Sequence, residues 1–538
     1  MVTISDLGAY TFPAMLENTL KKFSDRPALG FASGEPITYA EFGKRISSLK
    51  DLLYRIGVEK GDRVALFSTS APNWGVACFA TVTLGAISVP LLPDFNVKEV
   101  QTCLEHSGAK VLIASKKLLE KIPDPASLGI KHVITISDLS LISGKEVRTG
   151  SAPEVTISEE DTASIIYTSG TTGRSKGVEL SHRNFIFTAI GSQSFQRVNK
   201  YDVALSFLPL SHVYEFTIGF LLFVLNGSCV YYLEKPPTVT TLLPAMLKVR
   251  PTLMLSVPII MEKIYKNKIV PTFTTKESIT KLYAKPFFRK IFHRIAGKSL
   301  KKTFGGRLKF FGIGGSKVDP VVEQFLKEAH FPYAIGYGLT ETAPLLAGSG
   351  PKITVPGTVG PKMPGVELKI LDPDPETGIG ELVAKGLNVM KGYYKDPEMT
   401  ASVFTNDGWF RTGDLGEIDK KGRLSLKGRS KNLILNAAGE NIYPEDIEFV
   451  LNQHPFVTDS LVVEGDNASL VALVQIDEEK IKAEAEKRAS PTMIEHASRM
   501  KDQMGEAVSS AASGMSQAFV YKKEEILNEI KFFVNDNV

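Results

Sequence analysis

Cysteine is scarce in this chain, and the pattern of its few cysteines excludes two common devices of stabilisation. Only three occur in 538 residues, Cys78, Cys103 and Cys229. They lie far apart, with no CxxC spacing and no Cys/His cluster, so neither a disulfide framework nor a structural zinc site is expected. This usage favours a reducing, cytoplasmic compartment.

Long apolar runs and a strong net charge are also lacking. The most lipid-like stretch, Phe216–Leu233, is uncharged but is interrupted at residues 226–228 by Asn, Gly and Ser. A spanning helix needs ~20 apolar residues, so we expect a buried helix, a turn and a strand instead, and no transmembrane helix. The first twenty residues contain Asp6 and no apolar core, unlike a signal peptide. A formal charge of +4 is too small for a general nucleic-acid surface, so no nucleic-acid partner is expected.

What remains is an ordinary globular composition with an alternating pattern. The chain is 43% hydrophobic and shows no internal repeat. A helical period with Ile46, Leu49 and Leu53 on one face is followed by the apolar run Val64–Phe67 and by a second apolar helix. The alternation continues to Val111–Ala114 and predicts parallel sheets flanked by helices over the first ~350 residues.

The texture of the sequence changes twice after Pro356. Short strand-like runs, such as Val366–Leu371 and Gly380–Ala384, are separated by Pro- and Gly-rich turns and predict a small β unit. From Gly428 a helix, Pro444–Leu451, precedes two further strand-like runs. This predicts a final α+β domain.

The strongest local signal is Ala163–Gly177, which reads ASIIYTSGTTGRSKG. A strand-like run ends in a loop with three glycines, several hydroxyls and two cations, Arg174 and Lys176. Glycines let backbone N–H groups approach phosphate oxygens, hydroxyls donate further hydrogen bonds, and the cations offset negative charge. The spacing of Gly170, Gly173 and Gly177 is not that of a Walker A loop. The segment therefore predicts a polyphosphate-binding loop of another type.

This loop resembles the phosphate loop of the AMP-forming acyl- and aryl-CoA synthetase superfamily, the adenylate-forming enzymes. Five more motifs follow in the family's order: LPLSHVYE at Leu208–Glu215, GIGGSKVDP at Gly312–Pro320, GYGLTET at Gly336–Thr342, GWFRTGDLG at Gly408–Gly416 and GRSKNLILNAAGENIYPEDIE at Gly428–Glu448. The resemblance covers essentially the whole chain. It implies an α/β fold, with a large multi-subdomain N-terminal domain of helix-flanked sheets and a small β unit, followed by a small mobile α+β C-terminal domain.

The resemblance also implies ATP and coenzyme A as co-substrates, with Mg²⁺. Attack of a carboxylate on the α-phosphate joins two anions, so positioned cations must stabilise the developing charge. Glu341 resembles the Mg²⁺ ligand, with Thr168 at the same metal; Thr340 is expected to donate to the α-phosphate, and His212 resembles the gate of the acyl-carboxylate pocket. The residues expected to bind ATP or AMP are Thr168, Ser169, Gly170, Thr171, Thr172, Gly173, Lys176, Gly314, Gly315, Tyr337, Gly338, Asp414 and Arg429.

By the same resemblance the chain divides into an N-terminal domain, residues 1–426, and a C-terminal cap, residues 428–538. Residues of about 356–426 form the β subdomain, and Lys427 is the expected hinge. In the second half-reaction the cap rotates about this hinge and a thiol attacks the acyl adenylate. Gly439, in the loop Asn436–Glu440, is then expected to approach the adenylate and shape the pantetheine tunnel.

Two segments of the sequence indicate which carboxylic acid is the substrate and on which surface the protein meets it. Val257–Ile269 and the long segment after it resemble the long-chain fatty acyl-CoA synthetases more than the acetyl, aryl or amino-acid branches. The segment Lys276–Lys309 contains eleven Lys or Arg with interleaved Phe and Leu, and one acid, Glu277. Such a pattern favours peripheral contact with an anionic membrane, and a solvated charged face is an equally open interpretation.

The end of the sequence departs from the family pattern. Lys531–Val538, KFFVNDNV, does not form the Pro-rich strand with a lysine that ends the family, and Lys522, Lys523 and Lys531 fall in an amphipathic helix pattern. A cap domain without its final lysine-bearing strand is therefore expected, with adenylation slowed on the order of 10²- to 10³-fold.

The leading hypothesis is a ligase that activates a long-chain fatty acid as acyl-AMP and transfers it to coenzyme A, releasing AMP and pyrophosphate. One alternative enzyme stops at acyl-AMP or delivers the acyl group to a carrier protein. A non-catalytic protein that binds nucleotide and lipid is the alternative from a different class.

Overall fold

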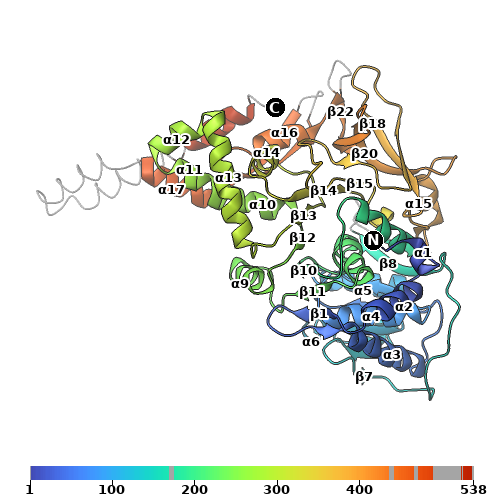
Figure 1. Cartoon of the computed structure of the whole chain (residues 1–538). Coiled ribbons are helices and arrows are strands. Elements are labelled where there is room, and N and C mark those ends of the chain that lie inside the picture. Colours follow the sequence, from blue (N-terminus) through green and yellow to red (C-terminus); the bar gives the residue numbers. More distant parts are fainter. Residues whose placement is uncertain are drawn as a thin grey trace, which may run out of the picture. The chain divides into compact units, whose positions relative to one another are not determined.

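The computed structural model describes residues 2–168, 175–435, 441–465, 470–488, 523 and 525–535. Figure 1 draws the whole chain, coloured along the sequence. Internal contacts divide the chain into two units. The first comprises residues 1–371, 382–412 and 418–425, and the second comprises residues 372–381, 413–417 and 426–538. Sheets flanked by helices make up the first unit, which confirms the predicted α/β class.

One eight-stranded sheet of the first unit carries the strands that surround the candidate site. Its inner strands are parallel, and its two edge strands are antiparallel to their neighbours. In spatial order the strands are β15 (Ala347–Gly348), β14 (Tyr333–Tyr337), β13 (Phe310–Ile313), β12 (Leu253–Ser256), β10 (Val203–Ser206), β11 (Cys229–Tyr232), β1 (Pro27–Phe31) and β2 (Ile37–Thr38). The carboxyl ends of the parallel strands therefore share one edge, where ligands bind in open α/β sheets.

The second eight-stranded sheet holds the phosphate-loop hairpin. Its strands in spatial order are β19 (Gly392–Tyr393), β9 (Lys176–Ser181), β8 (Thr162–Thr168), β4 (Ile87–Pro90), β3 (Arg63–Phe67), β5 (Val111–Ala114), β6 (His132–Thr135) and β7 (Leu141–Ser143). Strands β3 to β5 and the helices α3 (Tyr39–Arg55), α4 (Pro72–Thr83) and α5 (Val97–Ser107) confirm the predicted alternation.

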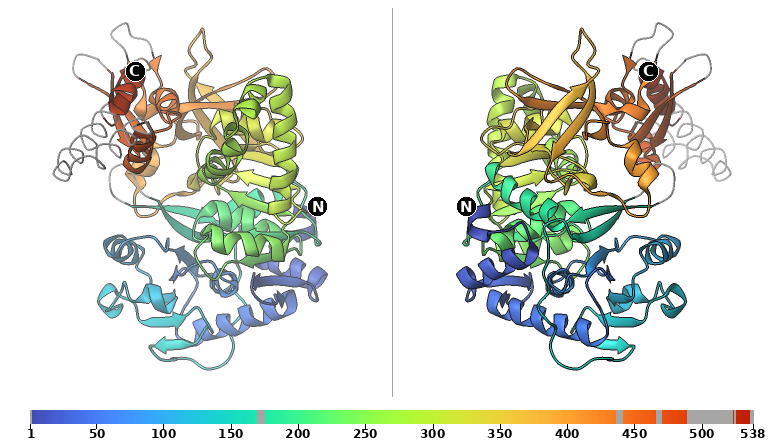
Figure 2. Two further views of the ribbon diagram at one scale, coloured as in Figure 1. Left: turned by 90° about the vertical axis from the view of Figure 1, so that its left-hand side faces the viewer. Right: turned by 90° about the vertical axis from the view of Figure 1, so that its right-hand side faces the viewer.

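Helices buried between the sheets supply the main core of the first unit. Phe79 of α4, Phe185 of α7 (His182–Gly191) and Phe220 of the π-helix η3 (Glu215–Leu221) belong to one cluster. Strand residues of both sheets, including Leu29 and Ile166, belong to the same cluster. Helix α4 is apolar on nearly all sides because it contacts β1 of one sheet and β3 and β4 of the other. Figure 2 shows the same elements from two further directions.

Local signals fix where several of these helices begin and end. Asn96 accepts the N–H of Glu99, whose carboxylate accepts the N–H of Asn96, so a capping box begins α5. Gly108 ends α5 in the left-handed conformation. Asp319 caps α14 (Pro320–Glu328), where Pro320 takes the first helical turn. The DP pair in the motif GIGGSKVDP is therefore a helix start.

The stretch Phe216–Leu233 folds as predicted. The π-helix η3 continues into α8 (Leu222–Leu225), a turn follows, and β11 completes the segment. Among the described residues, no helix is both long enough and apolar enough to cross a membrane.

A third sheet confirms the predicted small β unit. Its strands in spatial order are β16 (Gly360–Pro361), β21 (Arg423–Arg429), β20 (Phe410–Ile418), β18 (Gly380–Gly386) and β17 (Val366–Leu371). The division into two units runs through this sheet, since parts of β18, β20 and β21 belong to each.

The second unit also contains the predicted α+β elements. The helix α16 (Pro444–Leu451) precedes the antiparallel pair β24 (Val457–Glu464) and β25 (Leu470–Ile476), and α17 (Glu478–Arg488) follows. Residues 525–535 are helical, with Ile526 and Ile530 buried in a cluster with Val457 and Ile481. Lys531 lies exposed on this helix, which confirms the amphipathic pattern predicted there.

Candidate active site

The phosphate-loop hairpin places two of the predicted nucleotide-binding residues opposite each other. Thr168 ends β8 and Lys176 begins β9, and the two residues form a register pair in the antiparallel ladder. The predicted binding residues between them, Ser169, Gly170, Thr171, Thr172 and Gly173, lie outside the described residues. The hairpin thus fixes both ends of the loop.

Lys176 and Glu341 are linked through a residue that sequence reasoning missed, Tyr393. The Tyr393 hydroxyl donates to Glu341 Oε1 over 2.9 Å, and the Lys176 ammonium lies 5.3 Å from the centre of the Tyr393 ring. Such a cation–π contact favours the charged lysine near the ring. We call these three residues the phosphate-side cluster. Strand β19 brings Tyr393 here because it pairs with β9, with Tyr393 opposite Val178.

Tyr393 could have been found only as an aromatic within the motif-free segment KGYYKD. Its ring is buried, and burial raises the pKa of its hydroxyl well above the ordinary value, so it stays a hydrogen-bond donor. It therefore orients the Glu341 carboxylate.

The loop around Glu341 is held rigidly by backbone contacts. Thr340 and Glu341 lie in the short 3₁₀-helix η5 (Thr340–Thr342), where the Thr342 hydroxyl accepts the N–H of Leu339 and donates to the Pro344 carbonyl. A Cβ on Gly338 would lie 1.6 Å from the Pro344 carbonyl oxygen. Only glycine fits at this position. The second glycine of the motif GYGLTET is therefore required for the packing of this loop.

The buried Asn388 fastens the far side of the same loop. Its amide nitrogen donates to the Thr342 carbonyl over 3.2 Å and to the Leu345 carbonyl over 2.8 Å. Asn388 has no exposed surface, so these bonds are shielded from water and tie η5 to the segment that leads to β19.

Gly314, Gly315 and Tyr337 lie at the carboxyl ends of the adjacent parallel strands β13 and β14. Gly315 has φ of +96°, which only glycine adopts without strain. A Cβ on Gly314 would lie 3.2 Å from the ring of Tyr214. These three predicted nucleotide-binding residues are therefore brought together, and the ring of Tyr214 packs against Gly314.

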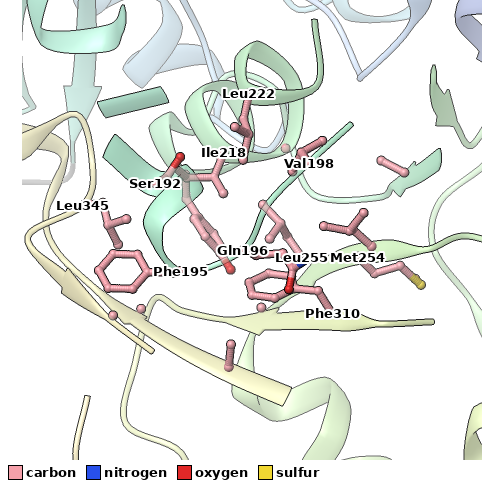
Figure 3. A pocket seen from close by; sticks show the side chains of 18 of the residues that line it. Ser192, Phe195, Gln196, Val198, Ile218, Leu222, Met254, Leu255, Phe310 and Leu345 are labelled. Atoms are coloured by element: carbon pink, nitrogen blue, oxygen red, sulfur yellow. The ribbon is translucent and has the colours of Figure 1, made fainter. Parts of the chain in front are cut away.

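A cavity with a mainly apolar lining opens beside β13 and β14 (Figure 3), and we call it the apolar cavity. It contains about 680 Å³ of space that no protein atom fills, part of which is open to solvent. Most of its lining is aliphatic or aromatic, and Figure 3 shows Ile218 and Leu222 pointing from the helical segment toward it. The other labelled apolar residues are Phe195, Val198, Met254, Leu255, Phe310 and Leu345.

Glu215 is an ionisable residue within this apolar lining. It is 2% exposed, and its Oε2 has no hydrogen-bond partner within the described ranges. Burial raises the pKa of the Glu215 carboxyl from its ordinary 4.5 to about 8, so at neutral pH it is protonated. Gly219, one helical turn on, makes room for it, because a Cβ there would lie 2.5 Å from the carboxyl. The sequence signal was an acid directly before an uncharged run.

His212, the predicted gate, begins the turn before Tyr214 and Glu215 but is not among the residues that line the cavity. Its side chain reaches the surface, and Nδ1 accepts the N–H of Tyr214 over 3.3 Å, which leaves the proton of a neutral ring on Nε2. The protein around the ring lowers the pKa of the imidazole through desolvation. The neutral form is therefore favoured at pH 7.

The second unit brings together two more predicted nucleotide ligands. Arg429 ends β21, and Asp414 lies in the middle of β20. Arg429 Nε lies 2.8 Å from Asp414 Oδ1. Lys427, the predicted hinge, pairs with Glu417 across the same two strands over 3.0 Å. Gly439 lies outside the part of the chain that the structure describes.

Known proteins resemble this chain over most of its length. The family model described as "AMP-binding enzyme" matches residues 16–394. A long-chain-fatty-acid–CoA ligase of Mycobacterium bovis, FadD15, is 30% identical over 82% of this chain and 78% of its own. Long chain acyl-CoA synthetase 6 of Arabidopsis thaliana, a peroxisomal protein, is 30% identical over 83% and 69%. A relative with a different acid in its name, 4-coumarate–CoA ligase 1 of Petroselinum crispum, is 28% identical over 82% and 80%.

Among solved structures, ATP-bound MatB from Rhodopseudomonas palustris superposes with a TM-score of 0.71 at 26% identity, covering 87% of this chain and 89% of that one. The fold is thus that of adenylate-forming ligases, as the motifs predicted. The chain belongs to the AMP-binding enzyme family.

Proposed function

We propose that this chain activates a long-chain fatty acid as acyl-AMP and transfers the acyl group to coenzyme A, releasing AMP and pyrophosphate. The observation that carries the proposal is the apolar cavity, which lies at the strands whose ends hold Gly314 and Tyr337. An aliphatic tail would fill this lining, while its carboxylate stays at the polar end. The names of the relatives support a long-chain acid and a coenzyme A acceptor.

In the first step the fatty carboxylate attacks the α-phosphate of ATP and pyrophosphate leaves. Lys176 and the hydroxyl of Thr168 flank the polyphosphate, and Thr340 donates to the α-phosphate. Tyr393 holds the Glu341 carboxylate in place, so its orientation is set before substrate binds. His212 does not line the apolar cavity itself, and in its neutral form it would add no competing charge where the acid's carboxylate lies.

The residues present fit a Mg²⁺ ion that arrives with the nucleotide. Glu341 offers a carboxylate oxygen and Thr168 a hydroxyl oxygen, and Mg²⁺ in nucleotide sites combines one or two carboxylates with substrate phosphates. In the described ranges no group of three His, Cys, Asp or Glu side chains could hold a metal alone. When bound, the ion would offset the phosphate charge.

In the second step a thiol attacks the acyl carbon and AMP leaves. Asp414 is positioned by Arg429 to accept from the ribose hydroxyls, Lys427 serves as the hinge of the cap, and Gly439 approaches the adenylate. We place the reaction in the cytoplasm.

The proposal is tested by product analysis on the purified chain with ATP, Mg²⁺ and fatty acids of graded length. Coenzyme A and a pantetheinylated carrier protein are supplied in separate reactions, and acyl-CoA, acyl-carrier protein and free acyl-AMP are quantified. Long-chain acyl-CoA as the main product supports the proposal. Acyl-carrier protein, acyl-AMP alone, or nucleotide binding without turnover would each replace it with one of the alternatives above.

A further inference from the structure

The helix α13 (Pro286–Thr303), labelled in Figure 1, belongs to the first unit and carries apolar residues on two opposite faces. Its buried face consists of His293, Ala296, Gly297 and Leu300. The opposite face is also apolar: Phe287 is 71% exposed and Ile295 is 58% exposed, with Ile291 between them at 39%. Residues four apart share one side of a helix, so these three form a continuous exposed stripe.

Polar contacts on the inner side fix the roll of this helix. Arg289 Nη2 lies 2.9 Å from Glu328 Oε1, and His293 Nδ1 lies 2.8 Å from Glu328 Oε2. At Gly297 the helix approaches α14 so closely that a Cβ would lie 2.2 Å from the Ala329 carbonyl oxygen. The stripe therefore cannot turn inward without breaking these contacts.

Cations line the stripe. Lys290, Arg294 and Lys298 repeat every fourth residue beside it, and all three are exposed. No Asp or Glu occurs in the sequence between Glu277 and Asp319, so this part of the chain supplies no acid to neutralise them. An apolar centre flanked by cations is the pattern of a helix that lies in the interface of an anionic bilayer.

We infer that α13 docks on an anionic lipid bilayer, with Phe287, Ile291 and Ile295 entering the headgroup region and the lysines and arginine contacting lipid phosphates. A nucleic acid would leave the apolar stripe uncovered. A second copy of the chain would bring two sets of like charges together. The stripe and its charge therefore favour lipid.

Docking on a bilayer would bring the proposed ligase to its substrate. This role of the docking rests on the proposed function, whereas the docking itself does not. The buried face of α13 belongs to the hydrophobic cluster that also includes Leu205 and Met254, two residues of the apolar cavity. A helix seated on lipid would thus share its hydrophobic core with residues of the cavity. Fatty acids are amphiphiles and partition into bilayers, where this face would meet them.

The test is co-flotation of the full-length chain with vesicles of phosphatidylcholine alone or of equimolar phosphatidylcholine and phosphatidylglycerol, without ATP or acid. The apolar variant combines Phe287→Ser, Ile291→Ser and Ile295→Ser, and the charge variant combines Lys290→Gln, Arg294→Gln and Lys298→Gln. Matched controls change exposed residues elsewhere: Ile142→Ser, Val321→Ser and Ile353→Ser for the first, and Lys98→Gln, Lys116→Gln and Lys117→Gln for the second.

We expect binding to the anionic vesicles that weakens at least about tenfold in each variant and not in the controls. Binding should fall with added salt for the wild type and much less for the charge variant. Turnover of a water-soluble short-chain acid should be the same in all proteins, which separates loss of the surface from loss of the ligase.

Wild-type protein that binds neither vesicle would overturn the inference, as would variants that bind like the wild type. A wild-type dimer in light scattering that the apolar variant converts to a monomer would assign the stripe to a second copy instead. Vesicle binding by a chain without ligase activity would retain the lipid surface and remove the proposed function.

Discussion

The phosphate-side cluster and the apolar cavity each contain one glutamate, and the surroundings of the two carboxyl groups are opposite in polarity. Glu341 receives a hydrogen bond from Tyr393. Glu215 keeps one oxygen without a partner among the described residues, and burial raises its pKa to about 8. In the proposed function the first carboxylate meets Mg²⁺ beside the phosphates. The second is neutral at pH 7, so the cavity around it carries no charge. Environment, and not residue type, separates the polar end of the site from its apolar end.

The largest effect is expected where the polar end depends on backbone packing. Gly338→Ala places a methyl group against the Pro344 carbonyl, so the loop that carries Glu341 must move. Displacement of a catalytic group by about 1 Å costs on the order of 100-fold in rate, and we expect at least that loss in kcat/KM. Gly34→Ala, where a Cβ meets nothing within 4 Å, is the control. Full activity in Gly338→Ala would show that this packing does not set the site.

Filling the apolar end should change selectivity instead of chemistry. Ile218→Trp puts a large ring into the cavity, and we expect kcat/KM for hexadecanoic acid to fall about 10- to 200-fold while butanoic acid is little affected. Ile353→Trp, at a residue that is 56% exposed, is the matched control. Equal losses for both acids would mean that the aliphatic tail of the fatty acid binds outside the apolar cavity.

A smaller loss is expected when the support of Glu341 is removed but its charge is kept. Tyr393→Phe retains the ring under Lys176 and deletes the hydroxyl that holds the carboxylate. Loss of such a supporting hydrogen bond costs about 10- to 100-fold. The concentration of Mg²⁺ needed for half-maximal rate should rise as well, since a mispositioned ligand binds the ion less well. An unchanged Mg²⁺ requirement would limit Tyr393 to a packing role.

The mildest change tests the neutral state of Glu215. Its carboxyl would lose its proton near pH 4.5 in the unfolded chain and near pH 8 in the fold, so the folded state binds more protons between these values. Stability should therefore decline as pH rises through this window. Glu215→Gln cannot ionise, and its thermal midpoint should fall less over the same range. Parallel pH profiles for the two proteins would contradict a raised pKa.

The sequence predicted the polar end of the site better than the apolar end. Phosphate binding needs glycines, hydroxyls and cations in one short segment, so the loop that contains Lys176 could be located from its residue types. Thr168 was assigned through the resemblance of this loop to the family's phosphate loop. Asp414 and Arg429 lie fifteen residues apart in the sequence, and adjacent strands bring them together. Their motifs identified them without that knowledge.

The apolar cavity could not be read in the same way. Leu255, Phe310 and Ile335 are ordinary core residues by pattern, and only the order of strands in the sheet decides which of them face a common space. Tyr393 was missed for a related reason, because its partner Glu341 lies 52 residues earlier and meets it through the β9–β19 pairing. The apolar stripe of α13 was visible only as interleaved Phe and Leu until the buried face of the helix was known.

The most direct test of this account is exchange of labelled pyrophosphate into ATP by the purified chain, which reports acyl-AMP formation without an acceptor thiol. Butanoic and hexadecanoic acids are compared in wild-type protein, in Glu341→Gln and in the exposed control Glu376→Gln. The account predicts exchange that is strongest with the long acid and that falls by about 100-fold or more in Glu341→Gln alone. Exchange that ignores chain length, or that survives the loss of the Glu341 charge, would contradict the assignment of these two regions.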